Sequence, residues 1–220
     1  MRESRLAVPP LLRRAVAYEV GMWRSLYRWI LRRPPALEPG AEAFSYLGVV
    51  RPILGVFIGL SAIEIPIFDL IISRTVPWEW VRTLALVLGA WGLLWMIGLF
   101  ASLRLHPHVV GDSGLRIRNG TTVDFTLPWS AIATLDARYR SLPSSRTLQL
   151  EKDGDGGLVL NVGTGSQTSV DVALRAPLAI PLAKGPSEPV TELRLYADDP
   201  TGLVSCARRH LARHLSGSGS

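Results

Sequence analysis

The chain has 220 residues, of which 48% are hydrophobic and 19% charged, and its formal net charge is +6. The mean hydropathy of +0.24 excludes a disordered chain and is high for a soluble globular protein. The single cysteine, Cys206, excludes an internal disulfide and any metal site built on paired thiolates. The excess apolar residues are not spread evenly along the chain.

The first predicted element is a basic amphipathic helix over residues 11–33, followed by a linker over 36–43 that begins after Pro34-Pro35. Its apolar positions recur at helical spacing: Leu12, Val16, Val20, Trp23, Leu26, Tyr27 and Ile30. Arg24, Arg28 and Arg32 share another face with Arg14, so we expect them to contact anionic lipid headgroups from a helix lying in the membrane surface. The alternative is that the apolar face packs against the cytoplasmic domain. Residues 1–44 form this cytoplasmic region.

Two apolar segments, 52–73 and 83–103, predict a transmembrane hairpin within residues 45–104. About 20 apolar residues cross the ~30 Å hydrocarbon core of a bilayer as a helix. The charged connection from Arg74 to Arg82 is too short for anything but two antiparallel spans, which places both chain ends on one side. Trp78 and Trp80 in this connection are typical of residues at a membrane interface.

The distribution of arginines predicts the orientation of the hairpin. Residues 1–51 contain nine arginines and the connection contains two. Because basic residues accumulate on the cytoplasmic side of spans, we expect both termini in the cytoplasm and the connection outside.

Two acidic residues, Glu64 and Asp69, interrupt the first span. A charge at the bilayer centre costs about 3 kcal/mol, so such residues usually face protein or a cavity. The two acids are separated by about 140° around a helix and do not share one face. Glu64 is therefore expected to hold the hairpin or a homo-oligomer together, and the alternative is contact with a polar transmembrane partner or a proton path.

Residues 105–215 predict a small antiparallel β domain closed by a C-terminal helix, which makes the chain a membrane-anchored α+β protein. Short alternating segments separated by turn residues indicate seven strands, at 115–118, 123–127, 147–151, 158–162, 170–174, 178–182 and 191–196. Asp199 and Pro200 suit the start of a helix, on which an apolar stripe is formed by Leu203, Ala207, Leu211 and Leu215. Such elements predict a sandwich or barrel, with residues 216–220 as a flexible tail.

Two segments carry a resemblance to a known family: His106-Pro-His-Val-Val-Gly-Asp-Ser-Gly-Leu-Arg-Ile-Arg-Asn-Gly120, which enters the β domain, and Leu127-Pro-Trp-Ser-Ala-Ile132. With Ala197-Asp-Asp-Pro200 before the last helix, the order of elements over residues 45–215 resembles the membrane-anchored bacterial PH-domain proteins. The resemblance implies a PH-like domain that acts as a scaffold or interaction module and does not catalyse a reaction.

The residues themselves predict no enzyme, cofactor or metal site. His106 and His108 lack further metal ligands, and His210 and His214 lie among arginines on what is expected to be a solvated basic face. No nucleotide-binding or nucleophile motif occurs. Residues 104–220 contain 13 basic and 11 acidic residues, so the basic excess lies beside the membrane and nucleic acid is not an expected partner.

The segment 136–146 is the longest polar connection predicted between strands. It places Arg138, Arg140 and Arg146 around Tyr139 and Leu142, which suits contact with anionic headgroups because arginine binds phosphate oxygens bidentately. The alternative is a solvated hairpin loop. The sequence thus predicts a membrane adaptor that binds a protein or lipid at the cytoplasmic face, or an accessory subunit of a larger membrane complex that engages a partner helix through Glu64 or Asp69.

Overall fold

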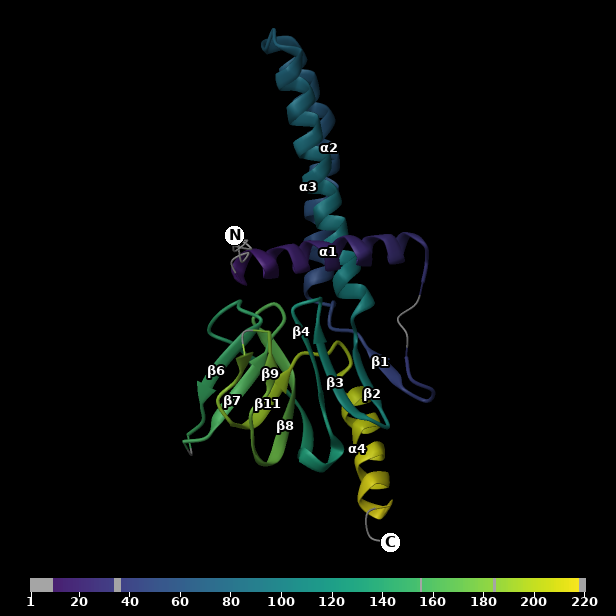
Figure 1. Cartoon of the computed structure of the whole chain (residues 1–220), viewed down its shortest axis with the longest axis vertical. Helices are drawn as coiled ribbons and strands as arrows, with labels where there is room; N and C mark the ends of the chain where they lie inside the picture. The colour runs from purple at the N-terminus through teal and green to yellow at the C-terminus, as the bar shows by residue number, and fades with distance from the viewer. Residues whose placement is uncertain (1–9, 34–36, 155, 184, 218–220) are drawn as a thin grey trace, which may run out of the picture.

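A computed structural model describes residues 10–33, 37–154, 156–183 and 185–217. A long helical hairpin projects from a β-rich C-terminal domain, and a third helix crosses the base of the hairpin next to the domain (Figure 1). The two apolar helices and the sheet-rich domain that the sequence predicts are both present.

The hairpin consists of α2 (Val50–Thr75) and α3 (Glu79–Leu105), and both are long and apolar enough to cross a membrane. They extend beyond the apolar segments 52–73 and 83–103, because apolar composition marks only the middle of each helix. The residues of α2 that are half-buried repeat every three or four positions, as in a coiled coil: Val50, Leu54, Ile58, Ser61, Ile65, Asp69 and Ile72. Gly89 of α3 allows close approach, since a Cβ there would lie 3.1 Å from Ile65 Cγ1.

Helix α1 (Pro10–Ile30) confirms the predicted N-terminal helix. It packs on α3, where Met22 is fully buried and a Cβ at Gly98 would lie 3.1 Å from Met22 Cγ. Trp23 also contacts Trp91, with ring centroids 5.0 Å apart. The helix ends before Arg32, whose φ of 52° is left-handed. The predicted stop at Pro34-Pro35 lies outside the described residues.

The domain contains two larger sheets and a two-stranded ribbon. One sheet has the order β1 (Glu42–Phe44), β2 (His108–Gly111), β3 (Gly114–Asn119), β4 (Val123–Leu127). The other has the order β5 (Ile132–Ser141), β8 (Gln167–Leu178), β11 (Val190–Leu195), β7 (Leu158–Val162), β6 (Leu148–Lys152). The ribbon pairs β9 (Pro181–Leu182) with β10 (Gly185–Pro186), and one 3-10 turn, η1 (Trp129–Ala131), precedes β5. The two larger sheets share one hydrophobic core.

This architecture differs from the expected seven antiparallel strands in three respects. Strands β1, β2, β5 and β10 were not expected, and β1 lies where the sequence predicted a linker. Strand β7 pairs with β11 in parallel, and the described strands form no closed barrel. The physical reason for β1 is tertiary: three residues with one buried side chain, Phe44, become a strand only because β2 offers an edge to pair with.

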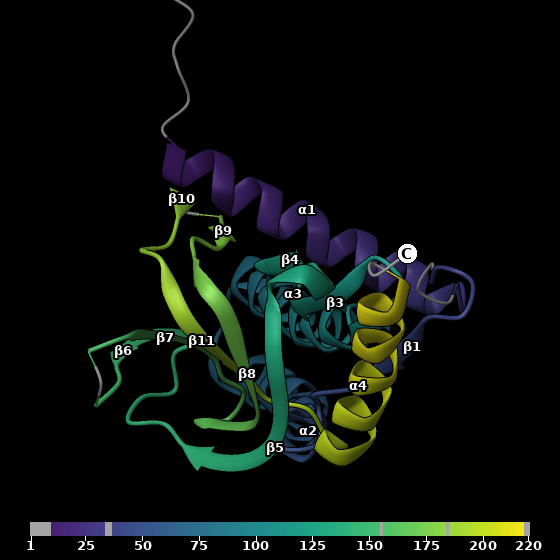
Figure 2. The same ribbon diagram turned by 90° about the horizontal axis from the view of Figure 1, so that it is seen from below.

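Helix α4 (Pro200–Gly217) packs beside β5, η1 and β2 (Figure 2). Its predicted N-cap is confirmed, because Asp199 Oδ1 accepts a hydrogen bond from Gly202 N at 2.8 Å. Leu203 and Ala207 are fully buried in the core. The helix extends to Gly217, into the segment expected to be a flexible tail, and residues 218–220 lie outside the described part of the chain.

Candidate functional site

The hairpin base, α1 and the β domain meet at a junction organised around Tyr46, which lies between β1 and α2. Tyr46 is only 1% exposed, and its hydroxyl oxygen accepts a hydrogen bond from Gly120 N at 2.8 Å. Burial raises the pKa of Tyr46 above its ordinary value, so the phenol stays neutral. Its ring lies 4.9 Å from that of His108. Tyr46 therefore joins the start of α2 to the turn between β3 and β4.

His108 is the second buried residue of the junction. Its Nδ1 accepts a hydrogen bond from Arg118 N at 3.1 Å, and its Nε2 lies 2.9 Å from Tyr196 O, to which it donates in the neutral tautomer that these two contacts require. Burial lowers the pKa of His108 to about 4. His108 thus holds β2 against β3 and the end of β11, and it has the role of a structural residue and not of a metal ligand.

Asp198 provides a third link between the domain and the hairpin. Its carboxylate accepts hydrogen bonds from Leu47 N at 3.0 Å and Gly48 N at 2.7 Å, and its own backbone N–H donates to Ser45 O at 2.8 Å. A Cβ at Gly48 would lie 2.7 Å from Asp198 Oδ1, so only glycine fits there without displacing this carboxylate. The segment between β11 and α4 is therefore fastened to the chain that enters α2.

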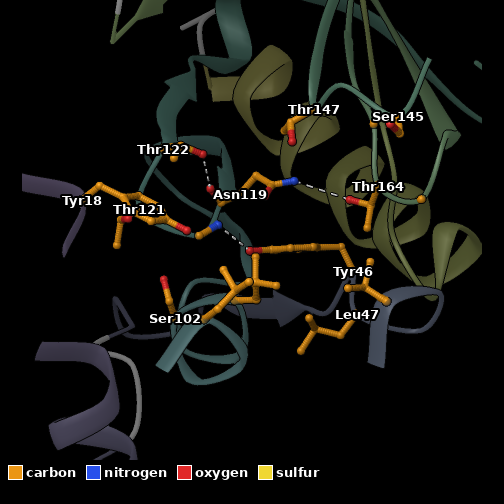
Figure 3. A pocket seen from close by; sticks show the side chains of 16 residues that line it. Tyr18, Tyr46, Leu47, Ser102, Asn119, Thr121, Thr122, Ser145, Thr147 and Thr164 are labelled. Carbon is orange, nitrogen blue, oxygen red and sulfur yellow. Dashed lines mark hydrogen bonds between the residues drawn. The ribbon is translucent and has the colours of Figure 1, made fainter. Parts of the chain in front are cut away.

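These contacts surround a pocket of about 320 Å³ between α1, α3 and the β domain (Figure 3). Its lining includes no charged side chain, and its polar side chains include Tyr18, Asn119 and a set of hydroxyls: Ser102, Thr121, Thr122, Ser145, Thr147 and Thr164. Asn119 Nδ2 donates to Thr164 Oγ1 at 3.5 Å, and Thr122 Oγ1 donates to Asn119 O at 3.0 Å. Such a lining can bind a neutral polar group through hydroxyl donors and acceptors, and it offers no nucleophile with a neighbouring base.

Helix α1 presents two different faces at this junction. Tyr18 lines the pocket, and a Cβ at Gly21 would lie 3.0 Å from Thr121 Cγ2, so this side of the helix faces the β domain. The opposite side leaves large apolar residues about half exposed: Leu12, Val16, Val20, Tyr27 and Ile30. The sequence leaves two alternatives for α1, packing against the β domain and contact with the membrane surface. One side of the helix packs on protein, and the opposite side is uncovered.

The predicted lipid-contact arginines do not lie together. Arg24 is exposed on α1, Arg28 is half-buried there, and Arg32 lies beyond the helix end. The first part of the segment 136–146, up to Ser141, is not a loop, because it belongs to β5 and pairs with β8. Arg140 is bound to Asp171 across that pairing, with Nη2 2.9 Å from Oδ2.

Arg138 is exposed on β5, and Arg146 is exposed on the connection that leads to β6. Arg146 lies between Ser145 and Thr147, which line the pocket. Leu142, expected to be available for insertion, is buried at 8% exposure, whereas Tyr139 is 67% exposed. Of the three arginines, only Arg146 is therefore adjacent to the junction.

The two acids of α2, Glu64 and Asp69, have different surroundings. Asp69 forms a two-point ion pair with Arg82, at 2.6 and 2.8 Å, near the end of the hairpin that is remote from the β domain. Glu64 lies near the middle of α2 with its side chain exposed, and within the described part of the chain it has no hydrogen bond or ion pair. The acid that stabilises the hairpin by direct contact is thus Asp69.

His210 corrects a further expectation, because it is buried at 6% exposure instead of lying on a solvated face. Its ring stacks on Trp129, with centroids 5.7 Å apart, and Nδ1 lies 3.2 Å from Asp112 Oδ1. Its position three residues after Ala207, on the apolar side of α4, is the signal that sequence reasoning missed. Among the described residues no group of three or more His, Cys, Asp or Glu side chains could hold a metal ion.

No family model matches this sequence, and neither a curated protein nor a solved structure matches it. The comparisons therefore give no support for the resemblance to PH-domain proteins or for a bacterial origin. What is shown is the pair of apolar helices and the sheet-rich C-terminal domain fastened to their base.

Proposed function

We propose that this chain is a non-enzymatic adaptor of the bacterial cytoplasmic membrane, in which the hairpin spans the bilayer and a PH-like domain binds a protein or lipid at the cytoplasmic face. The observation that carries the proposal is the junction between the domain and the hairpin base. The hydrogen bonds of Tyr46 and Asp198 join the domain to the chain that enters α2, and helix α1 packs on α3 through Met22 and approaches the domain where Gly21 meets Thr121. An adaptor needs such an orientation, because the tether alone sets only its distance from the membrane.

The uncovered side of α1 supports the same arrangement. Its apolar residues point away from the β domain, which is the direction in which the hairpin extends (Figure 1). A helix with this composition lies in the interface with its apolar side among the acyl chains. The bilayer would then cover both the hairpin and the outer side of α1, and Arg24 would lie at headgroup level.

The first experiment tests the orientation. A reporter enzyme that is active only in the cytoplasm is fused after Ser216 of the full chain, and the same reporter is inserted in the connection between α2 and α3 as the matched control. We expect activity from the first fusion alone. Activity from the second fusion alone would contradict the proposed topology.

The exposure of Glu64 favours a second function, that of an accessory subunit of a transport or secretion complex. An acidic side chain facing lipid is unfavourable, so a helix of a partner or of a second copy would cover it. A photo-crosslinking residue at Ile67, on the same exposed side as Glu64, is expected to capture that helix, whereas the same residue at Ile65, packed on α3, captures only the chain itself.

Crosslinked purification from detergent separates the two functions. A stoichiometric integral membrane partner favours the accessory subunit, and recovery of a soluble partner or of bound lipid favours the adaptor. Capture at Ile65 to the same extent as at Ile67 would contradict a partner helix at Glu64.

A further inference from the structure

A second cavity lies at the base of the hairpin, on the other side of Leu47 and Leu103 from the hydroxyl-lined pocket. Its volume is about 290 Å³, and its walls come from the segment before α2, the last turns of α3 and the loop that carries Asp198. Arg51 and Arg104 both line it. We propose that this cavity binds the phosphate group of an anionic phospholipid from the surrounding bilayer. The inference rests on the proposed insertion of the hairpin in a membrane.

Charge is the first argument. Arg51, one residue into α2, and Arg104, one residue from the end of α3, are exposed, and neither forms an ion pair with any described residue. The acid in the wall, Asp198, forms no ion pair with either arginine, since its two carboxylate oxygens accept hydrogen bonds from Leu47 N and Gly48 N. Two cations and one anion leave the wall with a net charge of +1. Two guanidiniums facing one cavity favour an anion, and their planar donor groups match phosphate oxygens.

The position of the cavity selects a lipid over a soluble phosphate compound. The two arginines lie at the ends of α2 and α3 that are next to the β domain, just beyond the apolar part of the hairpin. In the proposed orientation this is the level of the headgroup phosphates of the cytoplasmic leaflet. Phe100 and Leu103 line the same cavity on the side of the apolar span. A phospholipid would therefore place its phosphate between the guanidiniums and begin its acyl chains along these two side chains.

The same geometry predicts a preference among phospholipids. The headgroup of phosphatidylglycerol adds no positive charge, whereas the choline of phosphatidylcholine brings a cation close to two guanidiniums. The phosphate is common to both lipids, so the preference comes from the rest of the headgroup. We therefore expect the cavity to favour phosphatidylglycerol by about tenfold, which lies within the range of the repulsion between like charges a few ångströms apart near a protein surface.

The experiment uses the full chain in neutral detergent. Native mass spectrometry counts the lipid that the protein retains, and thermal unfolding is followed after addition of phosphatidylglycerol, phosphatidylcholine or inorganic phosphate. The test variant is R51Q/R104Q. The matched control is R74Q, at the opposite end of α2.

We expect one retained phosphatidylglycerol and a rise in unfolding temperature for the wild type, a loss of affinity of tenfold or more for R51Q/R104Q, and no change for R74Q. Equal affinity for both lipids, an unaffected double variant, or an equal loss in R74Q would overturn the proposal. Stabilisation by inorganic phosphate to the same extent as by lipid would also overturn it, because the ligand would then be a soluble phosphate compound.

Two further measurements keep the outcome interpretable. Unfolding in detergent without lipid shows whether the double variant folds, and the single variants R51Q and R104Q replace it if it does not. Membrane extraction with alkaline carbonate tests insertion separately. A chain that is extracted contradicts the proposed function, whereas a chain that stays in the membrane and retains no phosphatidylglycerol contradicts the lipid site alone.

Discussion

Protonation of His108 is expected to destabilise the attachment of the β domain to the hairpin. The neutral ring accepts a hydrogen bond from Arg118 N and donates one to Tyr196 O, both inside the protein. A protonated ring has no acceptor, so the buried Arg118 N–H would lose its partner and face a second N–H group. A fall in pH is therefore expected to break the hydrogen bond between Arg118 N and His108.

The magnitude follows from the difference between the folded and unfolded pKa of His108. The pKa is about 4 in the folded protein and 6.5 for an ordinary histidine, which corresponds to about 3 kcal/mol of unfolding free energy. Because the unfolded state binds the proton more tightly, this contribution is fully present above pH 6.5 and is lost as the pH falls from 6.5 towards 4. His108 is 2% exposed, so solvent screening does not reduce it appreciably.

The assay is thermal unfolding of the full chain in neutral detergent, followed by tryptophan fluorescence between pH 7.5 and 4.5. In the variant H108Q the amide supplies one acceptor and one donor but does not titrate. We expect the wild type to lose stability with falling pH more steeply than H108Q, and the exposed-site control H214Q to follow the wild type. An identical pH dependence in the wild type and H108Q would refute the reasoning, since the titrating group would then lie elsewhere.

Three substitutions test other contacts. Tyr46→Phe leaves a buried backbone N–H without its acceptor and is expected to reduce the unfolding free energy by about 1–3 kcal/mol in denaturant titration. Gly98→Leu should displace α1 through Met22 and increase its cleavage by protease, whereas Gly92→Leu, where a Cβ meets nothing within 4 Å, should not. Glu64→Gln should be tolerated in assembly, measured by crosslinking, better than Glu64→Lys; equal loss in both would indicate contact with an ionised partner.

The helices were predictable because each has a local signal. Apolar composition located both spans, and the spacing of apolar residues located α1 to within three residues at each end. The cap at Asp199 identified the start of α4. In each case the deciding interaction lies within one or two helical turns, which is the range that a sequence pattern samples.

The strands were harder to predict where tertiary pairing overrides composition. Strand β5 carries three charged residues, Asp136, Arg138 and Arg140, of which the first two are exposed, so its sequence is typical of a loop. It is nevertheless paired with β8 along most of its length, and the ion pair between Arg140 and Asp171 lies across that pairing. A polar edge strand has no alternation strong enough to distinguish it from a connection.

The contacts at the junction between the hairpin and the β domain could not be predicted from local sequence patterns, because they join residues that are far apart in the chain. Asp198 and the amides it binds, Leu47 N and Gly48 N, are about 150 residues apart in the chain. Tyr46 and Gly120 are 74 residues apart. Neither pair has a sequence signature, because an aspartate before a helix and a tyrosine before a span are common in many contexts. Only the fold brings them together.

The pattern of α1 was ambiguous because its apolar stripe is wider than one packing partner can cover. Leu26 is buried and Trp23 contacts Trp91, so α3 covers one edge of the stripe. Val16 and Val20 lie on the other edge, where they stay 53% and 45% exposed after α3 and the β domain have packed. A stripe with an uncovered edge requires a second apolar environment, since that edge would otherwise be solvated at a cost of about 25 cal/mol per Å². The hairpin extends on that side of α1, so the bilayer proposed to surround the hairpin would also cover this edge and complete its packing.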